Sequence, residues 1–128
     1  SGHVSVEEQG KMAPARVLKF TKDKKWAPAV DPLHFDKSQV GVGLGKTFGE
    51  VMAEANPKVT IGLIPCAFGG TPISRWQKGA DLYQNAVERA RTAMKDGTLK
   101  GILWHQGETD SGNATVAPKY GDLLTQLV

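Results

Sequence analysis

The spacing of apolar residues along the chain predicts three strands and three helices. Short apolar runs bounded by polar or proline residues are typical of buried strands, and apolar side chains at three- and four-residue intervals are typical of amphipathic helices. The predicted strands are residues 16–20, 59–64 and 99–104, and the predicted helices are residues 45–55, 81–95 and 120–128. Residues 26–37 carry two prolines and predict a long surface loop.

The helix boundaries and buried faces also follow from this pattern. Asn56-Pro57 is expected to end the first helix, Asp81 to cap the second, and Gly97 to end the second. The predicted buried faces are Leu44, Phe48, Val51, Met52 and Ala55 in the first helix, Tyr83, Val87, Ala90 and Met94 in the second, and Leu123, Leu124 and Leu127 in the third.

The order strand, helix, strand, helix, strand, helix indicates an α/β fold. Such alternation favours right-handed crossovers and a parallel sheet that is covered by helices on both faces. We therefore expect residues 1–128 to form a single domain. Parallel sheets normally contain more than three strands, and the last helix has no stop signal, so the fold is expected to be incomplete at both ends.

Composition excludes several functional classes. The formal charge of +3 comes largely from clustered lysines such as Lys22, Lys24 and Lys25, with few aromatic residues between them, which favours a solvated surface over a nucleic-acid interface. No apolar stretch is long enough to span a membrane, so a soluble protein is expected, in a compartment that the sequence leaves open. Cys66 is the only cysteine, which excludes an internal disulfide and favours a buried, unreactive thiol. The oligomeric state is left open.

Two loops follow predicted strands and carry the candidate chemistry. One contains Gly69 and Gly70, and the other is the polar run from Trp104 to Asp110. Because ligands bind at the carboxyl ends of strands in open α/β sheets, one shared site is predicted. Glycine backbone N–H groups and the side-chain amide of Gln106 could form an oxyanion hole there. The alternative is that Gly69-Gly70 is only a tight turn.

Residues 64–76 and 101–110 resemble the internal blocks of the SGNH hydrolase superfamily. The most similar branch is the sialate O-acetylesterase and acetylxylan esterase-like group, carbohydrate esterase family 6, and residues 31–43 also resemble this group. The resemblance implies a three-layer α/β/α sandwich, flavodoxin-like in outline, and an acetylated carbohydrate substrate without a metal or organic cofactor. It also implies that Gly69 or Gly70 and Gln106 are the oxyanion donors. The candidate substrate-binding residues are Thr71, Arg75, His105, Glu108 and Asp110.

The chain departs from the family pattern at the nucleophile and the base. The family's serine lies in a Gly-Gln-Ser-Asn-Met string that this chain lacks, and Ser1-Gly2-His3 resembles the residues that follow that string. The family's Asp-x-x-His near the carboxyl end is also missing. The sequence therefore predicts the central part of a carbohydrate O-acetylesterase. The alternative is a carbohydrate-binding or scaffold protein of the same fold without catalysis.

Other motifs have weaker interpretations. Asp31-Pro-Leu-His34 has the spacing of the missing pair, but it precedes the first predicted helix, where the family carries a similar string in addition to its catalytic one. Residues 41–47 resemble a phosphate-binding loop, but Val40 stands where its first glycine is required. His105, Glu108 and Asp110 lack a defined metal-ligand pattern. Residues 113–115 form a glycosylation acceptor only in a secreted eukaryotic protein, and the two tryptophans of these blocks, Trp76 and Trp104, are suited either to packing or to sugar stacking.

Overall fold

A small mixed sheet organises one end of the molecule. The structure, a computed structural model, describes residues 15–128, and its sheet has the strand order β2-β1-β3. The strands are β1 (Val17–Phe20), β2 (Trp26–Pro28) and β3 (Ile61–Leu63). Strand β1 is antiparallel to β2 and parallel to β3. The fold is therefore α/β, but the sheet is not purely parallel as predicted.

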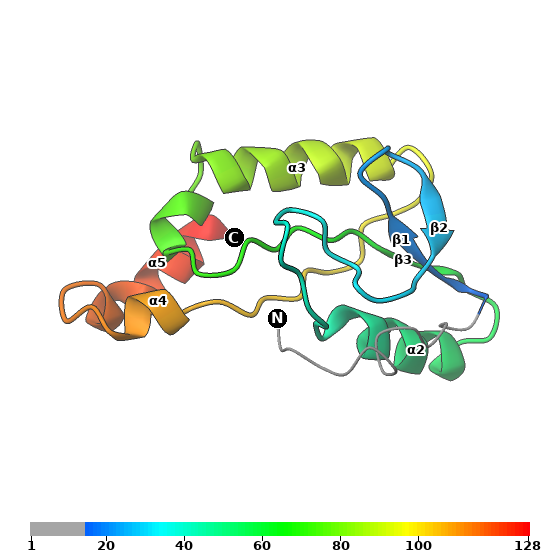
Figure 1. The fold of residues 1–128 in the computed structure, drawn as a ribbon, viewed down its shortest axis with the longest axis horizontal. Coiled ribbons are helices and arrows are strands. Elements are labelled where there is room, and N and C mark those ends of the chain that lie inside the picture. Colours follow the sequence, from blue (N-terminus) through cyan, green and yellow to red (C-terminus); the bar gives the residue numbers. More distant parts are fainter. Residues whose placement is uncertain (1–14) are drawn as a thin grey trace.

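The two longest helices within residues 15–128 lie on opposite sides of the non-helical segments that run through the middle of the molecule (Figure 1). They are α2 (Gly45–Ala55), α3 (Asp81–Ala93), α4 (Glu108–Ser111) and α5 (Tyr120–Leu127), with 3₁₀ turns at η1 (Ile73–Trp76) and η2 (Ala117–Lys119). Figure 1 shows α2 and α3 on opposite sides of the segments between them, with α4 and α5 together at the far end from the sheet. No helix within residues 15–128 is long and apolar enough to cross a membrane.

Strand β1 was predicted as a strand, whereas β2 was predicted as part of a surface loop, and that prediction is wrong for residues 26–28. Trp26 pairs with Phe20 across the ladder, and their ring centroids are 4.9 Å apart. Pro28 is compatible with this strand because β2 is an edge strand, where a missing N–H leaves no ladder bond unmade. Aromatic packing across the hairpin thus outweighs the local signal of a proline-containing loop.

Residues 99–104 do not form the third predicted strand. They are assigned no strand and pair with no other segment among the described residues, and Ile102 is 75% exposed. An apolar extended segment becomes a strand only when a neighbouring strand completes its hydrogen-bond ladder. The outer edge of β3 is likewise unpaired within residues 15–128. The pattern identified a segment suited to a sheet, while the described residues supply no partner for it.

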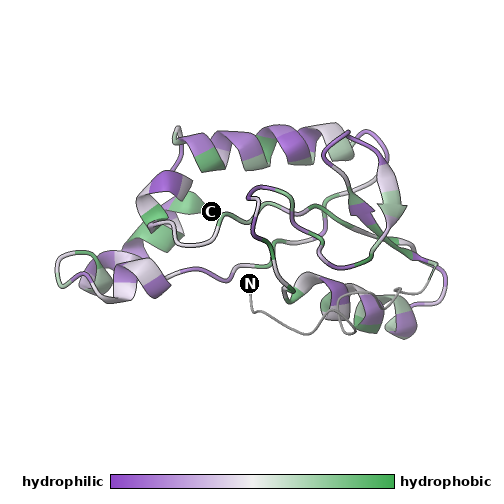
Figure 2. Cartoon of the chain, viewed as in Figure 1, coloured by the Kyte–Doolittle hydropathy of each residue, from purple (hydrophilic) through white to green (hydrophobic). Residues whose placement is uncertain are grey.

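The position of helix α2 was predicted correctly, but its buried face was not. Phe48, Val51 and Met52 are more than two-fifths exposed, and Figure 2 shows green, hydrophobic residues beside purple ones around this helix. The buried residues are instead Lys46, Gly49 and Ala53. A Cβ at Gly49 would lie 2.8 Å from the Val17 Cγ1 atom, so the missing side chain allows the helix to approach the sheet closely.

Helix α3 also differs in detail from the prediction. It ends at Ala93 rather than at residue 95. Its buried residues are Leu82 and Ala93, whereas the sequence predicted that the face with Tyr83, Val87, Ala90 and Met94 would be buried. Its N-cap is Ala80, so Asp81 is the first helical residue and not the cap. The carboxylate of Asp81 instead pairs with the guanidinium of Arg75.

Helix α5 is held against η1, which fixes the position of its first residue, Tyr120. The Gln77 Nε2 atom donates a hydrogen bond to the Leu123 carbonyl oxygen at 3.0 Å. The helix begins at Tyr120 as predicted and ends at Leu127, one residue before the predicted end. Its amino-terminal end lies next to the loop that carries the polar run, since the Tyr120 hydroxyl is 2.7 Å from the Gln106 carbonyl oxygen.

Candidate active site

The two loops predicted to share one site are in direct contact. The Gln106 Nε2 atom donates a hydrogen bond to the Thr71 carbonyl oxygen at 2.9 Å. In the opposite sense, the Ile73 backbone N–H donates to the Asp110 Oδ2 atom at 2.8 Å. The first bond joins the loop that precedes η1 to the loop that precedes α4, and the second joins η1 to α4. The sequence therefore predicted correctly that distant segments meet here.

Gln106 lies at the centre of this contact and has all its amide groups engaged. In addition to Thr71, its Nε2 atom donates to the Asp110 Oδ2 atom at 2.7 Å, so both amide hydrogens have acceptors. Its Oε1 atom accepts a hydrogen bond from the Tyr120 hydroxyl at 2.7 Å. The side chain is therefore held at both ends of the amide.

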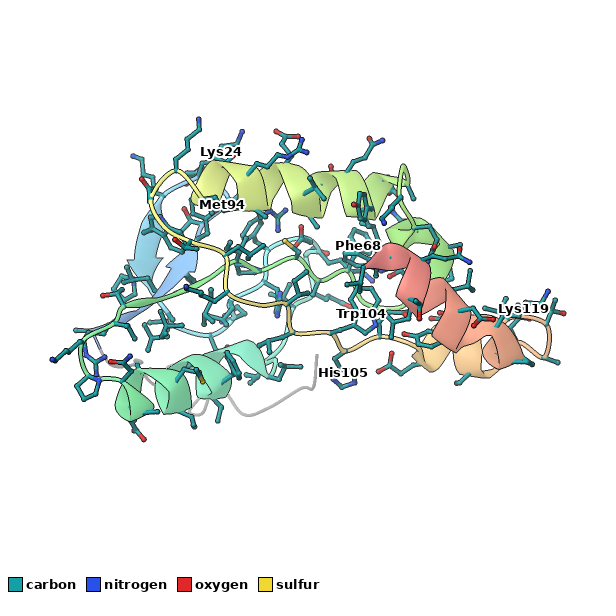
Figure 3. All side chains as sticks on the ribbon, turned by 180° about the vertical axis from the view of Figure 1, so that it is seen from behind. Lys24, Phe68, Met94, Trp104, His105 and Lys119 are labelled. Atoms are coloured by element: carbon teal, nitrogen blue, oxygen red, sulfur yellow. The ribbon has the colours of Figure 1, made fainter. Side chains whose placement is uncertain are left out.

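Two aromatic side chains support Gln106, and only one of them was singled out from the sequence. The Trp104 Nε1 atom donates to the Tyr120 hydroxyl oxygen at 3.1 Å. Figure 3 shows Trp104 beside α5, whereas His105 points to the other side of the backbone. Trp104 also packs edge-on against Trp76, with 5.6 Å between ring centroids. Tyr120 was missed because it lies beyond the polar run, where the sequence marked it only as the first residue of the last predicted helix.

The Thr71 side chain is bonded within the protein and is not accessible to a ligand. It is buried, its hydroxyl donates to the Phe68 carbonyl oxygen at 2.7 Å, and it accepts the Trp76 Nε1 hydrogen at 3.1 Å. These bonds fix the turn formed by Gly69 and Gly70.

The two glycines present open backbone to solvent. Gly70 has φ of +76°, a conformation that favours glycine. No atom lies within 4 Å of a Cβ built on either Gly69 or Gly70. Among residues 15–128, no carbonyl or side chain accepts the N–H of either glycine. The backbone of this turn is therefore exposed, and the Lys37 Nζ atom donates a hydrogen bond to its Gly69 carbonyl oxygen at 3.1 Å.

The remaining candidate residues lie at the surface. The His105 Nε2 atom lies 2.9 Å from the Glu108 Oε1 atom, and the two side chains are 70% and 75% exposed. The hydrogen bond from the backbone N–H of Glu108, followed by the nearby His105, lowers the pKa of the Glu108 carboxyl group. Arg75 stacks over the Phe68 ring at 5.1 Å.

The Asp110 side chain points away from His105 and Glu108. It is only 3% exposed, and its carboxylate is directed at Ile73 and Gln106. The three residues His105, Glu108 and Asp110 therefore do not converge on one point. No group of three or more potential metal ligands occurs among the described residues.

A cleft of about 210 Å³ lies beside the Phe68 side of the loop, under α3. On its wall, the Arg89 guanidinium pairs with the Asp36 carboxylate at 2.7 Å. Cys66 lines the same cleft, and burial raises the pKa of its thiol, which fits the unreactive role expected for it.

Among the described residues, no side-chain hydrogen bond joins Asp31 or His34 to the two loops. Burial lowers the pKa of His34, whose Nδ1 atom has no hydrogen-bond partner among the described residues. Burial raises the pKa of Asp31. A buried histidine that favours the neutral form, next to a carboxyl group that favours protonation, is not a poised acid–base pair. Ser1-Gly2-His3 lies outside the described residues.

An α/β chain with an open glycine turn tied to a buried amide network fits the class of ester hydrolases. A family profile described as carbohydrate esterase, sialic acid-specific acetylesterase, matches residues 1–128. The chain therefore belongs to this carbohydrate esterase family.

Relatives agree with this assignment. The chain is 36% identical over 118 residues to the probable carbohydrate esterase At4g34215 of Arabidopsis thaliana, covering 88% of this chain and 45% of that protein. The X-ray structure of the Arabidopsis protein superposes with a TM-score of 0.82 at 35% identity, over 91% of this chain and 54% of that one. The chain thus spans about half the length of the relatives that it matches.

Proposed function

We propose that the full protein that contains this chain is a serine esterase, which removes O-acetyl groups from a carbohydrate. In this reaction a serine attacks the acetyl carbonyl, a histidine takes the serine proton, and an acid orients that histidine. These three groups are assigned to segments outside residues 1–128. The contribution of the present chain is the oxyanion hole.

The observation that carries the proposal is the open turn at Gly69 and Gly70 in contact with Gln106. The glycine N–H groups supply donors without a competing acceptor among the described residues. Gln106 contributes the side-chain N–H that is donated to the Thr71 carbonyl oxygen. In the proposal, this N–H is shared between that carbonyl oxygen and the oxyanion. Thr71 directly follows Gly70, so the donor lies beside the glycine turn. Such donors stabilise the negative charge that develops only in the transition state.

The exposed candidates are assigned to the substrate. Arg75, His105 and Glu108 are assigned to contacts with the sugar because their side chains are open to solvent near the two loops. Thr71 and Asp110 act indirectly in this proposal, since both are buried and bonded within the protein. The proposed chemistry needs no metal or organic cofactor.

The test is the intact mass of the full gene product before and after a serine-reactive organophosphonate, together with acetate release from acetylated xylo-oligosaccharides. We expect one stoichiometric adduct and loss of acetate release after labelling. A product that forms no adduct and releases no acetate contradicts the esterase proposal. Labelling of a heat-denatured sample controls for nonspecific reaction.

A binding protein of the same fold is the second candidate. It is favoured by the internal use of both Gln106 amide hydrogens, which are donated to the Thr71 carbonyl oxygen and the Asp110 carboxylate. Calorimetry separates the two candidates, because binding of acetylated oligosaccharides without turnover supports only the second.

We further propose that the full protein forms a three-layer α/β/α sandwich in which another strand pairs with residues 99–104. The unpaired outer edge of β3 and the exposed Ile102 support this placement. Figures 1 and 3 show this segment running between α2 and α3. Paired strands protect their amides from exchange with solvent.

Hydrogen exchange tests the strand proposal directly. We expect the amides of residues 99–104 to exchange slowly in the full protein and rapidly in the 128-residue chain. Rapid exchange in both proteins contradicts the additional strand. The amides of helix α5 serve as an internal reference, since their bonds lie within the described chain.

A further inference from the structure

Tyr120 makes two contacts with one residue of the candidate oxyanion hole. Its hydroxyl lies 2.7 Å from the Gln106 Oε1 atom and 2.7 Å from the Gln106 backbone carbonyl oxygen. We infer that Tyr120 is a positioning residue that holds the Gln106 amide in its donating orientation. The catalytic consequence of this inference rests on the proposed function, whereas the positioning itself does not.

The orientation of an amide group is set by what faces each end. The nitrogen and oxygen ends of glutamine have nearly the same shape, so sterics alone do not select between them. Here the Asp110 carboxylate faces the nitrogen end and the Tyr120 hydroxyl faces the oxygen end. Rotation of the amide by half a turn would direct its oxygen at the Asp110 carboxylate and would leave the Tyr120 hydroxyl only the Gln106 backbone carbonyl as an acceptor.

The direction of the Tyr120 hydrogen bond is fixed by Trp104. An indole N–H is only a donor, so the hydroxyl oxygen must accept the Trp104 Nε1 hydrogen at 3.1 Å. The single hydroxyl proton is then free to be donated to Gln106. Tyr120 therefore acts as a donor toward Gln106, and a phenylalanine at this position would supply nothing in its place.

The same side chain also fixes the backbone at this point. Gly107, the next residue, has φ of +138°, and a Cβ built there would lie 3.4 Å from the Tyr120 ring. The single hydroxyl proton is shared between the Gln106 backbone carbonyl and Oε1 oxygens, each at 2.7 Å, and the contact with the carbonyl spans this turn. The backbone and the amide of Gln106 are thus held by one group that sits at the start of α5.

Kinetics of the full protein test the catalytic consequence. We expect Tyr120→Phe to lower kcat about 10-fold for p-nitrophenyl acetate, with KM changed by less than about 2-fold, because misplacement of a transition-state donor affects chemistry more than binding. Since Tyr120 acts through Gln106, the double variant with Gln106→Ala should be no slower than Gln106→Ala alone. Tyr83→Phe, a tyrosine of α3 outside the site, is the control and should retain the wild-type kcat.

A second readout is independent of activity. With glutamine side chains labelled with ¹⁵N, the amide resonances of Gln106 should shift and exchange faster with water in Tyr120→Phe, but not in Tyr83→Phe. Unchanged amide resonances in Tyr120→Phe overturn the inference, as do kinetic losses that multiply in the double variant. If Gln106→Ala retains the wild-type kcat, the oxyanion proposal fails, and the amide resonances alone still decide the positioning role.

Discussion

Replacement of Gln106 by alanine is expected to lower kcat of the full protein about 100-fold while KM changes little. The loss of one oxyanion-hole donor typically has this size, because the donor meets charge that is present only in the transition state. Alanine removes the Nε2 donor that lies against the Thr71 carbonyl oxygen at 2.9 Å. Steady-state kinetics with an acetyl ester give both constants.

Gln106 also joins two loops, so its structural role must be separated from its catalytic one. The variant Gln106→Met keeps the length of the side chain without its donors and should be as slow as Gln106→Ala. Thermal unfolding of both variants reports the structural cost. A kcat equal to that of wild type in a variant that remains folded excludes Gln106 from the oxyanion hole. A rise in KM alone indicates a substrate contact instead.

The meeting of the two loops could be predicted because it depends on chain order and on polar residues at the ends of apolar runs. The sequence predicted that the loop of Gln106 and the loop of the glycine turn lie together, and a hydrogen bond from Gln106 to Thr71 joins them. It could not predict that Asp110 turns inward while Glu108 stays exposed, since both are acidic residues in the same short run. That difference depends on Ile73, which lies 37 residues from Asp110 in the chain. The backbone N–H of Ile73 is donated to the Asp110 carboxylate.

The incorrect predictions for the sheet and helices have a related cause. Periodicity identifies segments with the correct local geometry, but the face that is buried depends on neighbours distant in the sequence. In α2, Gly49 permits close approach to Val17, and this packing selects a face other than the most apolar one. In residues 99–104, the apolar run is present but a strand partner is not among the described residues.

Replacement of Asp110 by alanine is expected to destabilise the chain by about 3 kcal/mol. A buried donor that loses its acceptor costs about 1–3 kcal/mol, and the Asp110 Oδ2 atom accepts hydrogen bonds from both the Ile73 N–H and the Gln106 amide. Asp110 is only 3% exposed, so water cannot readily replace the carboxylate. Urea unfolding followed by tryptophan fluorescence measures the change, since Trp76 and Trp104 lie against this network.

Glu108→Ala is the matched control, because it removes an acidic residue from the same helical turn. Its carboxylate is exposed and pairs only with exposed His105, so the urea midpoint should not change measurably. Asp110→Asn keeps one acceptor oxygen and should fall between wild type and Asp110→Ala. Equal midpoints for Asp110→Ala and Glu108→Ala would contradict the assignment of Asp110 as the residue that joins the two loops. If the assignment holds, the contact between the loop of Gly69 and Gly70 and the loop of Gln106 depends on the buried carboxylate of Asp110.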